Sequence, residues 1–198
     1  MRRHGWKLLR IELCTSTAAF VPNDFRGVQL NTASMPQIAY LSLGSNVGDR
    51  KSHLRDAITR LAGVGTIVAV SSFYETEPVE FTSQAWFLNC AAALETNDTP
   101  EQLMASVLAI EQEMGRQRIQ KKGPRTIDID IVLFGDRVVE SPTLTIPHPA
   151  MHRRRFVLEP LAEIAPQVRH PVLKKTAREL LDALPAGQIV RKLGSAPG

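Results

Sequence analysis

From residue 38 onward, hydrophobic residues follow the repeats of strands and helices in turn. Apolar residues recur at three- and four-residue spacing from about Asp49, with a stop at Gly63 or Gly65, and again from Thr99 to Met114, which predicts two helices. Runs rich in β-branched and aromatic residues predict four strands, at residues 38–43, 66–74, 86–96 and 126–134. The order β-α-β-β-α-β predicts an α+β, ferredoxin-like fold, in which helices cover one face of an antiparallel sheet.

Turn and capping signals refine these boundaries. Thr99-Pro100-Glu101-Gln102 is a capping box with proline at the first helical position, so the second helix is expected to begin there. Gly135-Asp136 predicts a hairpin turn from the last strand into a further strand at residues 137–140. Residues 150–198 are expected to add short helices, one of them beginning at the capping box Thr176-Ala177-Arg178-Glu179.

The first 36 residues differ from the rest of the chain. They show no sustained periodicity and are rich in Thr, Ser, Asn and Arg. We expect a leader, with translation starting near Met35, or a disordered extension. A transit peptide fits the Arg-rich and acid-poor composition, but Pro22 and weak amphipathicity disfavour it. The folded domain is therefore expected to span residues 37–198.

Composition and charge narrow the class of protein. With 198 residues, 43% of them hydrophobic, the chain can bury a core, and no apolar run approaches the ~20 residues of a membrane span. Cys14 and Cys90 form no disulfide framework, which favours a cytoplasmic setting. Five basic and two acidic residues lie among the first 36, so the remainder is nearly neutral. A near-neutral body disfavours nucleic-acid binding and favours a small anionic ligand.

The strand after Gly123-Pro124 carries the candidate chemistry. Successive strand side chains point to opposite faces, so Asp128 and Asp130 share one face with Thr126, and Ile127, Ile129 and Ile131 share the other. Carboxylates two residues apart have Cα atoms roughly 6.6 Å apart and can hold Mg²⁺ between them. The alternative is the solvated polar face of an edge strand.

Basic residues on both sides of this strand favour the metal interpretation. Between Met114 and Asp128 the chain has no acid and five basic residues: Arg116, Arg118, Lys121, Lys122 and Arg125. A second basic run, His152-Arg153-Arg154-Arg155, follows Pro147-His148-Pro149. Carboxylates that hold Mg²⁺, flanked by arginines that bind phosphate oxygens in pairs, are typical of phosphoryl transfer.

Several motifs together resemble one family. Gly123-Pro124-Arg125-Thr126-Ile127-Asp128-Ile129-Asp130-Ile131 is similar to the signature of the 6-hydroxymethyl-7,8-dihydropterin pyrophosphokinases of folate biosynthesis. Motifs in the same order agree over residues 38–172: Leu43-Gly44-Ser45-Asn46, 71–78, Phe87-Leu88-Asn89, Ile110-Glu111, 115–118 and Ile146-Pro147-His148. The resemblance implies transfer of diphosphate from ATP to a dihydropterin alcohol, with release of AMP and no assigned general base. It also implies the ferredoxin-like fold, and we expect a monomer.

The resemblance implies roles for individual residues. Two Mg²⁺ ions are expected on Asp128 and Asp130. The catalytic residues implied are Arg116, Arg125, Asp128 and Asp130. The ATP-binding residues implied are Glu111, Arg116, Arg118, Arg125, Ile131, Thr145, His148 and Arg154. The pterin-binding residues implied are Thr76, Pro78, Val79, Phe87, Asn89, Asp128 and Phe156. Among these, Phe87 and Phe156 would sandwich the flat pterin and Asn89 would bond to its edge. Lys121-Lys122 depart from the pattern, because many members carry an aromatic residue there.

Two other functions use the same residues. An RNA-binding module of this fold would stack bases on Phe73, Tyr74 and Phe87, but the chain lacks an RNP-type aromatic and basic run. A metal-dependent nucleotidyl transferase or nuclease would use the same aspartates. The substrate, rather than the pattern of residues, separates this second alternative from the pyrophosphokinase.

Overall fold

The computed structural model describes residues 35–78, 84–116 and 123–193. These ranges belong to one compact unit, Ala33–Gly198. Residues 1–34, where we expect a leader or an extension, lie outside the described residues. No helix within the described ranges is long and apolar enough to cross a membrane.

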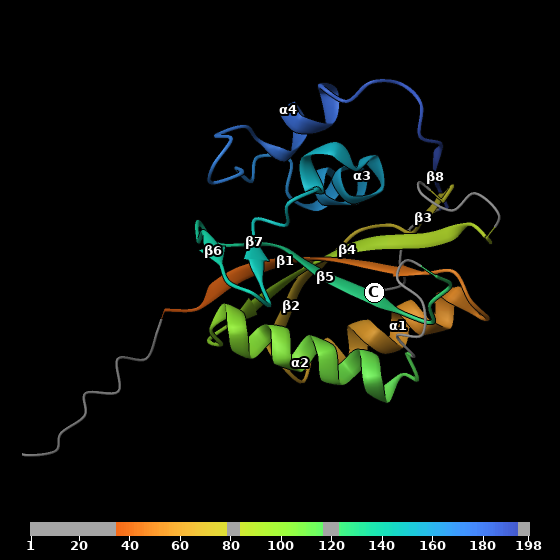
Figure 1. Ribbon diagram of the computed structural model, residues 1–198, viewed down its shortest axis with the longest axis horizontal. Helices are drawn as coiled ribbons and strands as arrows, with labels where there is room; N and C mark the ends of the chain where they lie inside the picture. Colours follow the sequence, from red (N-terminus) through yellow and green to blue (C-terminus); the bar gives the residue numbers. More distant parts are fainter. Residues whose placement is uncertain (1–34, 79–83, 117–122, 194–198) are drawn as a thin grey trace, which may run out of the picture. The chain divides into compact units, whose positions relative to one another are not determined.

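A six-stranded antiparallel sheet forms the centre of the domain (Figure 1). Its strands are β1 (Gln37–Ser45), β2 (Thr66–Val70), β3 (Tyr74–Thr76), β4 (Phe87–Thr96), β5 (Asp128–Phe134) and β8 (Val190–Lys192). The order is β5-β1-β4-β3-β8, and β2 also pairs with β4. The central position of the first and third predicted strands, β1 and β4, confirms the ferredoxin-like fold.

Two helices cover one face of this sheet, as predicted (Figure 1). They are α1 (Arg50–Leu61) and α2 (Pro100–Glu113). Asp49 caps α1 by accepting a hydrogen bond from the Ser52 N–H, and the capping box at the start of α2 is present in both directions. Apolar residues of both helices pack with β1, β4 and β5 into one core cluster, so local capping and burial of an apolar stripe together explain this layer.

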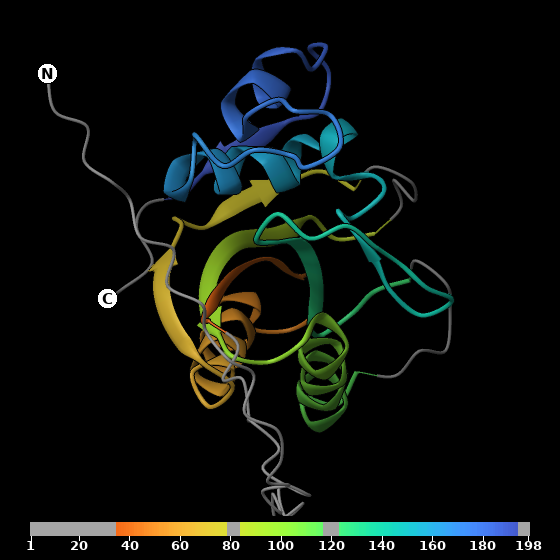
Figure 2. The ribbon, with the colours of Figure 1, turned by 90° about the vertical axis from the view of Figure 1, so that its left-hand side faces the viewer.

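The expected short helices of the C-terminal part cover the opposite face, a position that the sequence pattern did not assign to them (Figures 1 and 2). This part contains the short 3₁₀ helix η1 (Met151–Arg153), α3 (Arg155–Ile164) and α4 (Ala177–Asp182). The physical reason is a second apolar cluster, in which Val132 and Leu133 of β5 pack against Leu158 and Leu161 of α3. At the other end of α3, Glu163 accepts hydrogen bonds from Ser72 and Tyr74.

Two predicted strands differ from the structure, and one observed strand was not predicted. The strand expected at 66–74 is interrupted at Ser71. Ser71 N–H still donates to the Ala91 carbonyl, but the Ser71 hydroxyl, rather than a backbone carbonyl, accepts the hydrogen bond from Ala91 N–H. The predicted hairpin partner of β5 pairs elsewhere: β6 (Val139–Glu140) pairs with β7 (Thr145–Ile146) in a separate two-stranded sheet. Burial of Leu144 and Ile146 in the core cluster favours that pairing. Strand β8 was not predicted, because it has only three residues.

Candidate active site

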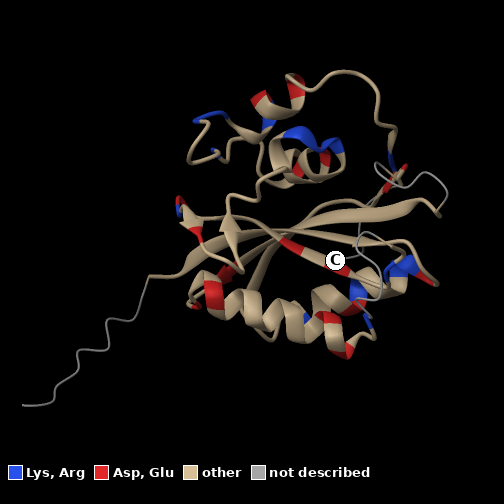
Figure 3. Ribbon diagram, viewed as in Figure 1, with Lys and Arg blue, Asp and Glu red and all other residues tan. Residues whose placement is uncertain are grey.

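The strand register gathers polar residues on the face that α3 covers only in part. Asp128 lies opposite Gly44, and Asp130 opposite Ser42, across the β1–β5 pair. On the other side of β1, Gly44 lies opposite Asn89 of β4. Asp128, Gly44 and Asn89 therefore form one row across three strands, and Figure 3 shows the acidic positions along β5.

The predicted alternation along this strand is confirmed. Ile127, Ile129 and Ile131 are at most 3% exposed and belong to the core cluster under the sheet. Asp128 and Asp130 are half-buried and face the other side. A solvated edge-strand face, the alternative interpretation, does not fit this burial.

The two carboxylates lie close to each other and to several arginine side chains. Burial raises the pKa of Asp130 to about 6, and the negative charge of Asp128 adds to the effect, while Arg154 and Arg116 partly oppose it. Arg116 Nη1 lies 2.7 Å from one oxygen of Asp128, and Arg125 contacts the other oxygen. Two guanidinium groups, both from the connection between α2 and β5, therefore contact Asp128.

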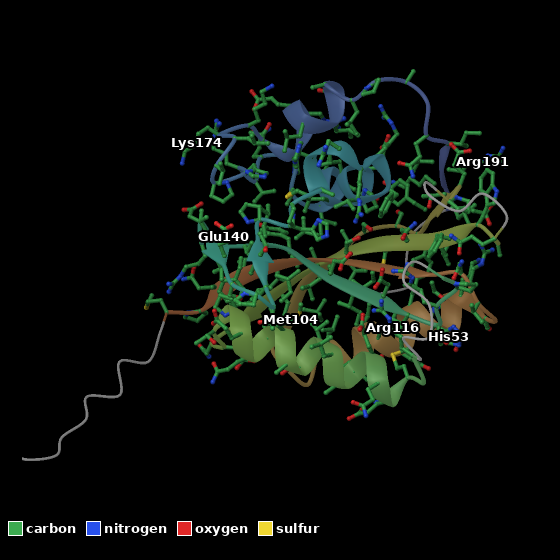
Figure 4. All side chains as sticks on the ribbon, in the orientation of Figure 1. His53, Met104, Arg116, Glu140, Lys174 and Arg191 are labelled. Atoms are coloured by element: carbon green, nitrogen blue, oxygen red, sulfur yellow. The ribbon has the colours of Figure 1, made fainter. Side chains whose placement is uncertain are left out.

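Glu111 holds Arg116 in this position. The Glu111 side chain is buried, and its carboxylate contacts the Arg116 guanidinium. The same carboxylate accepts a hydrogen bond of 2.8 Å from the N–H of Ile129, because β5 is an edge strand of the sheet. Glu111 thus fixes the strand and the arginine to each other. Figure 4 labels Arg116 just beyond the end of α2.

Asn46 connects the loops around the site, a role that sequence reasoning missed. Its Oδ1 accepts a hydrogen bond of 2.8 Å from Arg125 N–H, and its backbone N–H donates to the Arg125 carbonyl. Its Nδ2 donates to Gln84 Oε1 at 3.1 Å. The Gly44-Ser45-Asn46 motif was the available signal, but it does not say which loops the amide would reach.

The other end of the row is neutral. Asn89 Nδ2 donates a hydrogen bond of 2.7 Å to Thr76 Oγ1, and both residues are buried. A Cβ at Gly44 would lie 2.6 Å from Asn89 Oδ1, so a larger residue there would displace the Asn89 amide from its present position. The Arg125 guanidinium carbon lies 5.8 Å from the centre of the Phe87 ring. An aromatic face and a fixed amide therefore adjoin the charged end of the site.

The segment from His148 to Phe156 brings further predicted residues to this face. The Arg154 guanidinium carbon lies 5.6 Å from the centre of the Phe156 ring. Burial, followed by the positive charge of Arg154, lowers the pKa of His148. His148 Nδ1 accepts a hydrogen bond from Ala150 N–H, so in the neutral ring Nε2 carries the proton. Arg154 thus acts electrostatically on both Asp130 and His148.

Of the remaining predicted site residues, the structure describes Ile131, Thr145 and Pro78. The Ile131 side chain packs into the core on the face opposite the carboxylates, so it could contact a ligand on their face only through its backbone. Thr145 is exposed on β7, and Pro78 is buried after β3. Val79 and Arg118, together with Lys121 and Lys122, lie outside the described residues.

The carboxylate pair fits a hard cation that keeps open positions. Within the described ranges, no group of three or more His, Cys, Asp or Glu side chains could enclose a metal ion. Asp128 and Asp130 alone would leave most positions to water and phosphate oxygens, which is how Mg²⁺ is commonly held. The raised pKa of Asp130 supports this fit, because a cation would relieve the burial and repulsion that cause it.

Comparisons with known proteins agree with this geometry. Residues 40–166 match the family model described as 7,8-dihydro-6-hydroxymethylpterin-pyrophosphokinase (HPPK). A crystal structure of wild-type Plasmodium falciparum HPPK-DHPS superimposes with a TM-score of 0.59 at 17% identity, over 74% of this chain and 44% of that one. At this identity the likeness shows the fold alone.

Similar proteins come from bacteria and a fungus. The chain is 49% identical to a Bacillus subtilis 2-amino-4-hydroxy-6-hydroxymethyldihydropteridine pyrophosphokinase over 137 residues, which cover 68% of this chain and 81% of that protein. It is 45% identical to the folic acid synthesis protein fol1 of Schizosaccharomyces pombe over 152 residues, 76% of this chain but only 21% of that protein. Because the family model matches residues 40–166, more than half of the chain, the chain belongs to the 7,8-dihydro-6-hydroxymethylpterin-pyrophosphokinase family.

Proposed function

We propose that this protein transfers a diphosphate group from ATP to the hydroxymethyl oxygen of 6-hydroxymethyl-7,8-dihydropterin and releases AMP. The observation that supports this function is the single row in which Asp128, paired with two arginines, faces the amide of Asn89 across Gly44. Membership of the pyrophosphokinase family supplies the reaction class. We further propose that residues 37–198 form the catalytic domain, which acts as a monomer in the cytoplasm.

The neutral end of the row would bind the pterin. Phe87 and Phe156 offer ring faces for stacking, and the Asn89 amide has a carbonyl oxygen that Thr76 leaves available. The hydrogen bond from Asn89 to Thr76 fixes the amide orientation, so the oxygen would accept from a pterin N–H rather than rotate. Pro78 and Val79 would complete this subsite through the backbone that follows β3.

The charged end would bind ATP. Arg116 and Arg125 now contact Asp128, and they would exchange this carboxylate for phosphate oxygens, which arginine also binds in pairs. Arg154, at the N-cap of α3, and His148, between β7 and η1, would approach the same phosphates. Arg118, which lies outside the described residues, would join them. Glu111 would act indirectly, by holding Arg116, while Ile131 and Thr145 would contact the nucleotide from β5 and β7.

Asp128 and Asp130 would hold Mg²⁺, and we propose two ions. When bound, the metal would neutralise charge on the triphosphate and polarise its oxygens. The chain's own contribution is to keep two carboxylates side by side on a rigid strand, because their isoleucine neighbours are packed in the core.

The reaction forms one phosphorus–oxygen bond, breaks another, and releases the hydroxyl proton. The pterin hydroxymethyl oxygen bonds to the β-phosphorus, and the bond from that phosphorus to the oxygen bridging to the α-phosphorus breaks, so AMP leaves. The hydroxyl proton passes to solvent, and we assign no general base. Arg116, Arg125 and Arg154 would stabilise the charge that develops on the phosphate oxygens, which supplies most of the rate in such transfers.

The test measures AMP and diphosphorylated pterin from ATP with the purified full chain. Reactions that lack the dihydropterin alcohol or Mg²⁺ serve as controls. We expect both products in equal amounts and only when all components are present. Release of AMP without pterin, or transfer of a nucleotidyl group, would indicate the nucleotidyl transferase or nuclease. Binding of single-stranded RNA without any turnover would indicate the RNA-binding module.

A further inference from the structure

The last described strand lies beyond the segment that the family model matches. The match ends at residue 166, whereas β8 spans Val190–Lys192. Strand β8 pairs with β3 in antiparallel register, with Val190 opposite Thr76 and Lys192 opposite Tyr74. The function proposed above gives this C-terminal strand no role.

Ile189 and β8 contact the segments on one side of the proposed pterin subsite, namely the residues just after β3 and just before β4. Ile189 N–H donates a hydrogen bond of 2.8 Å to Glu77 Oε1, and Glu77 N–H donates to the Ile189 carbonyl at 3.3 Å. Thr76, the preceding residue, holds the Asn89 amide. In addition, the Arg191 guanidinium lies 5.0 Å from the centre of the ring of Trp86, next to Phe87, and Figure 4 labels Arg191 at this end of the sheet.

Gln188 contacts the first turn of α3, on the other side of the same subsite. Its Oε1 accepts a hydrogen bond of 3.3 Å from the N–H of Phe156, in the first turn of α3. N–H groups in a first turn have no partner within the helix, and the N-cap residue Arg154 supplies no side-chain cap here. Gln188 therefore caps α3 from a distant part of the chain, at the residue whose ring would stack on the pterin.

We propose that Gln188 is a positioning residue for the acceptor substrate. Together with Ile189 it ties the Phe156 turn of α3 to the chain after β3, so that Phe156 and Thr76 are held at a constant separation. This role rests on the proposed function. A stacked substrate binds between two aromatic faces, so its affinity depends on how well their separation is fixed beforehand.

The amide nitrogen of Gln188 allows a clean test. Gln188 Nε2 is buried and has no hydrogen-bond partner within the described ranges. Gln188→Met keeps the side-chain length and removes the unpaired nitrogen along with the capping oxygen. Because loss of the unpaired donor offsets loss of the hydrogen bond, the melting temperature should stay within about 3 °C of wild type. Gln188→Glu keeps an oxygen that can accept from Phe156 N–H.

The experiment measures the dissociation constant of 6-hydroxymethyl-7,8-dihydropterin, with a non-hydrolysable ATP analogue and Mg²⁺ present, and the KM for each substrate. We expect Gln188→Met to weaken pterin binding about five-fold while the KM for ATP stays within about two-fold. Gln188→Glu should restore most of the pterin affinity. Gln167→Met, at an exposed glutamine, is the matched control and should change neither value.

Two outcomes would overturn this role. Pterin affinity of Gln188→Met within two-fold of wild type, or an equal loss of ATP and pterin affinity together with a lower melting temperature, would show that Gln188 is only structural. Absence of pterin binding by the wild-type chain is a different result. It would overturn the proposed function and, with it, the acceptor role of Gln188.

Discussion

Between Asp128 and Ile131, the two faces of β5 differ in polarity and in what they pack against. Below the sheet, Ile129 and Ile131 are each 3% exposed and pack with α1 and α2. Above it, Asp128 and Asp130 contact or approach arginines from the loops before the strand and from the start of α3. Side chains that alternate along one strand cannot move independently of it. The apolar face therefore fixes the position of the carboxylates.

The comparison also shows where stability and chemistry conflict. Burial of the isoleucines favours folding, whereas burial of two like charges opposes it, and the raised pKa of Asp130 records that opposition. A protein keeps such a pair when a ligand or a cation uses it. Substitution of an aspartate should therefore lower activity without lowering stability. Substitution of an isoleucine should lower stability with little effect on activity.

The largest expected effect follows from Asp130→Asn. This substitution keeps the shape of the side chain and removes the charge that would hold Mg²⁺. We expect turnover, measured as AMP release, to fall by more than about a thousand-fold, because a metal ligand stabilises the transition state by several kcal/mol. The folded structure, followed by circular dichroism and urea unfolding, should be at least as stable as wild type at neutral pH.

Asp136→Asn is the matched control for this substitution. Asp136 is an exposed carboxylate in the turn that follows β5, so its loss should change neither turnover nor stability. If Asp130→Asn kept its turnover within ten-fold of wild type, the proposal that the carboxylates of β5 take part in the reaction would be wrong.

The next effect belongs to the lower face. Ile129→Ala removes buried methyl and methylene groups, so it should lower the free energy of unfolding by about 2–4 kcal/mol in urea titrations. The kcat of the folded fraction should stay within about three-fold of wild type, because the backbone N–H that binds Glu111 is retained. Val138→Ala, at an exposed valine, should change stability by no more than about 0.5 kcal/mol. A selective loss of kcat in Ile129→Ala would contradict the assignment of the lower face to stability alone.

Local patterns explain how much of this arrangement the sequence could predict. The alternation of Asp128, Ile129 and Asp130 fixes which side chains share a face wherever the strand lies. The caps at Asp49 and Thr99 act within four residues, so both helices were predicted close to their observed starts. The motif resemblance then led to the family that the comparisons show.

Features that depend on long-range packing could not be predicted in this way. The second helical layer exists because Val132 and Leu133 meet α3, and no local repeat encodes that contact. Glu111 has the sequence pattern of a helix-surface residue, yet it is buried, because its carboxylate binds an edge N–H of β5 and Arg116. Likewise, the links made by Asn46 and Gln188 join segments far apart in the sequence.

The smallest expected effect, and the sharpest comparison of the faces, is the pH dependence of stability. The pKa of Asp130 is raised from its ordinary value of 3.8 to about 6 in the folded protein, so the folded state binds its proton more tightly than the unfolded state. The corresponding stability is fully present below about pH 4 and is lost as the pH rises through 6. Asp130→Asn has no such proton. The free energy of unfolding of wild type, minus that of Asp130→Asn, should therefore fall by about 2–3 kcal/mol between pH 4 and pH 7 in metal-free urea titrations. Groups remote from this pair titrate alike in both proteins, so the difference reports the titration of Asp130 together with its effect on the neighbouring Asp128. A difference that stays constant or rises with pH would mean that the carboxylate face does not oppose folding, and that the two faces of β5 differ in chemistry without differing in their effect on stability.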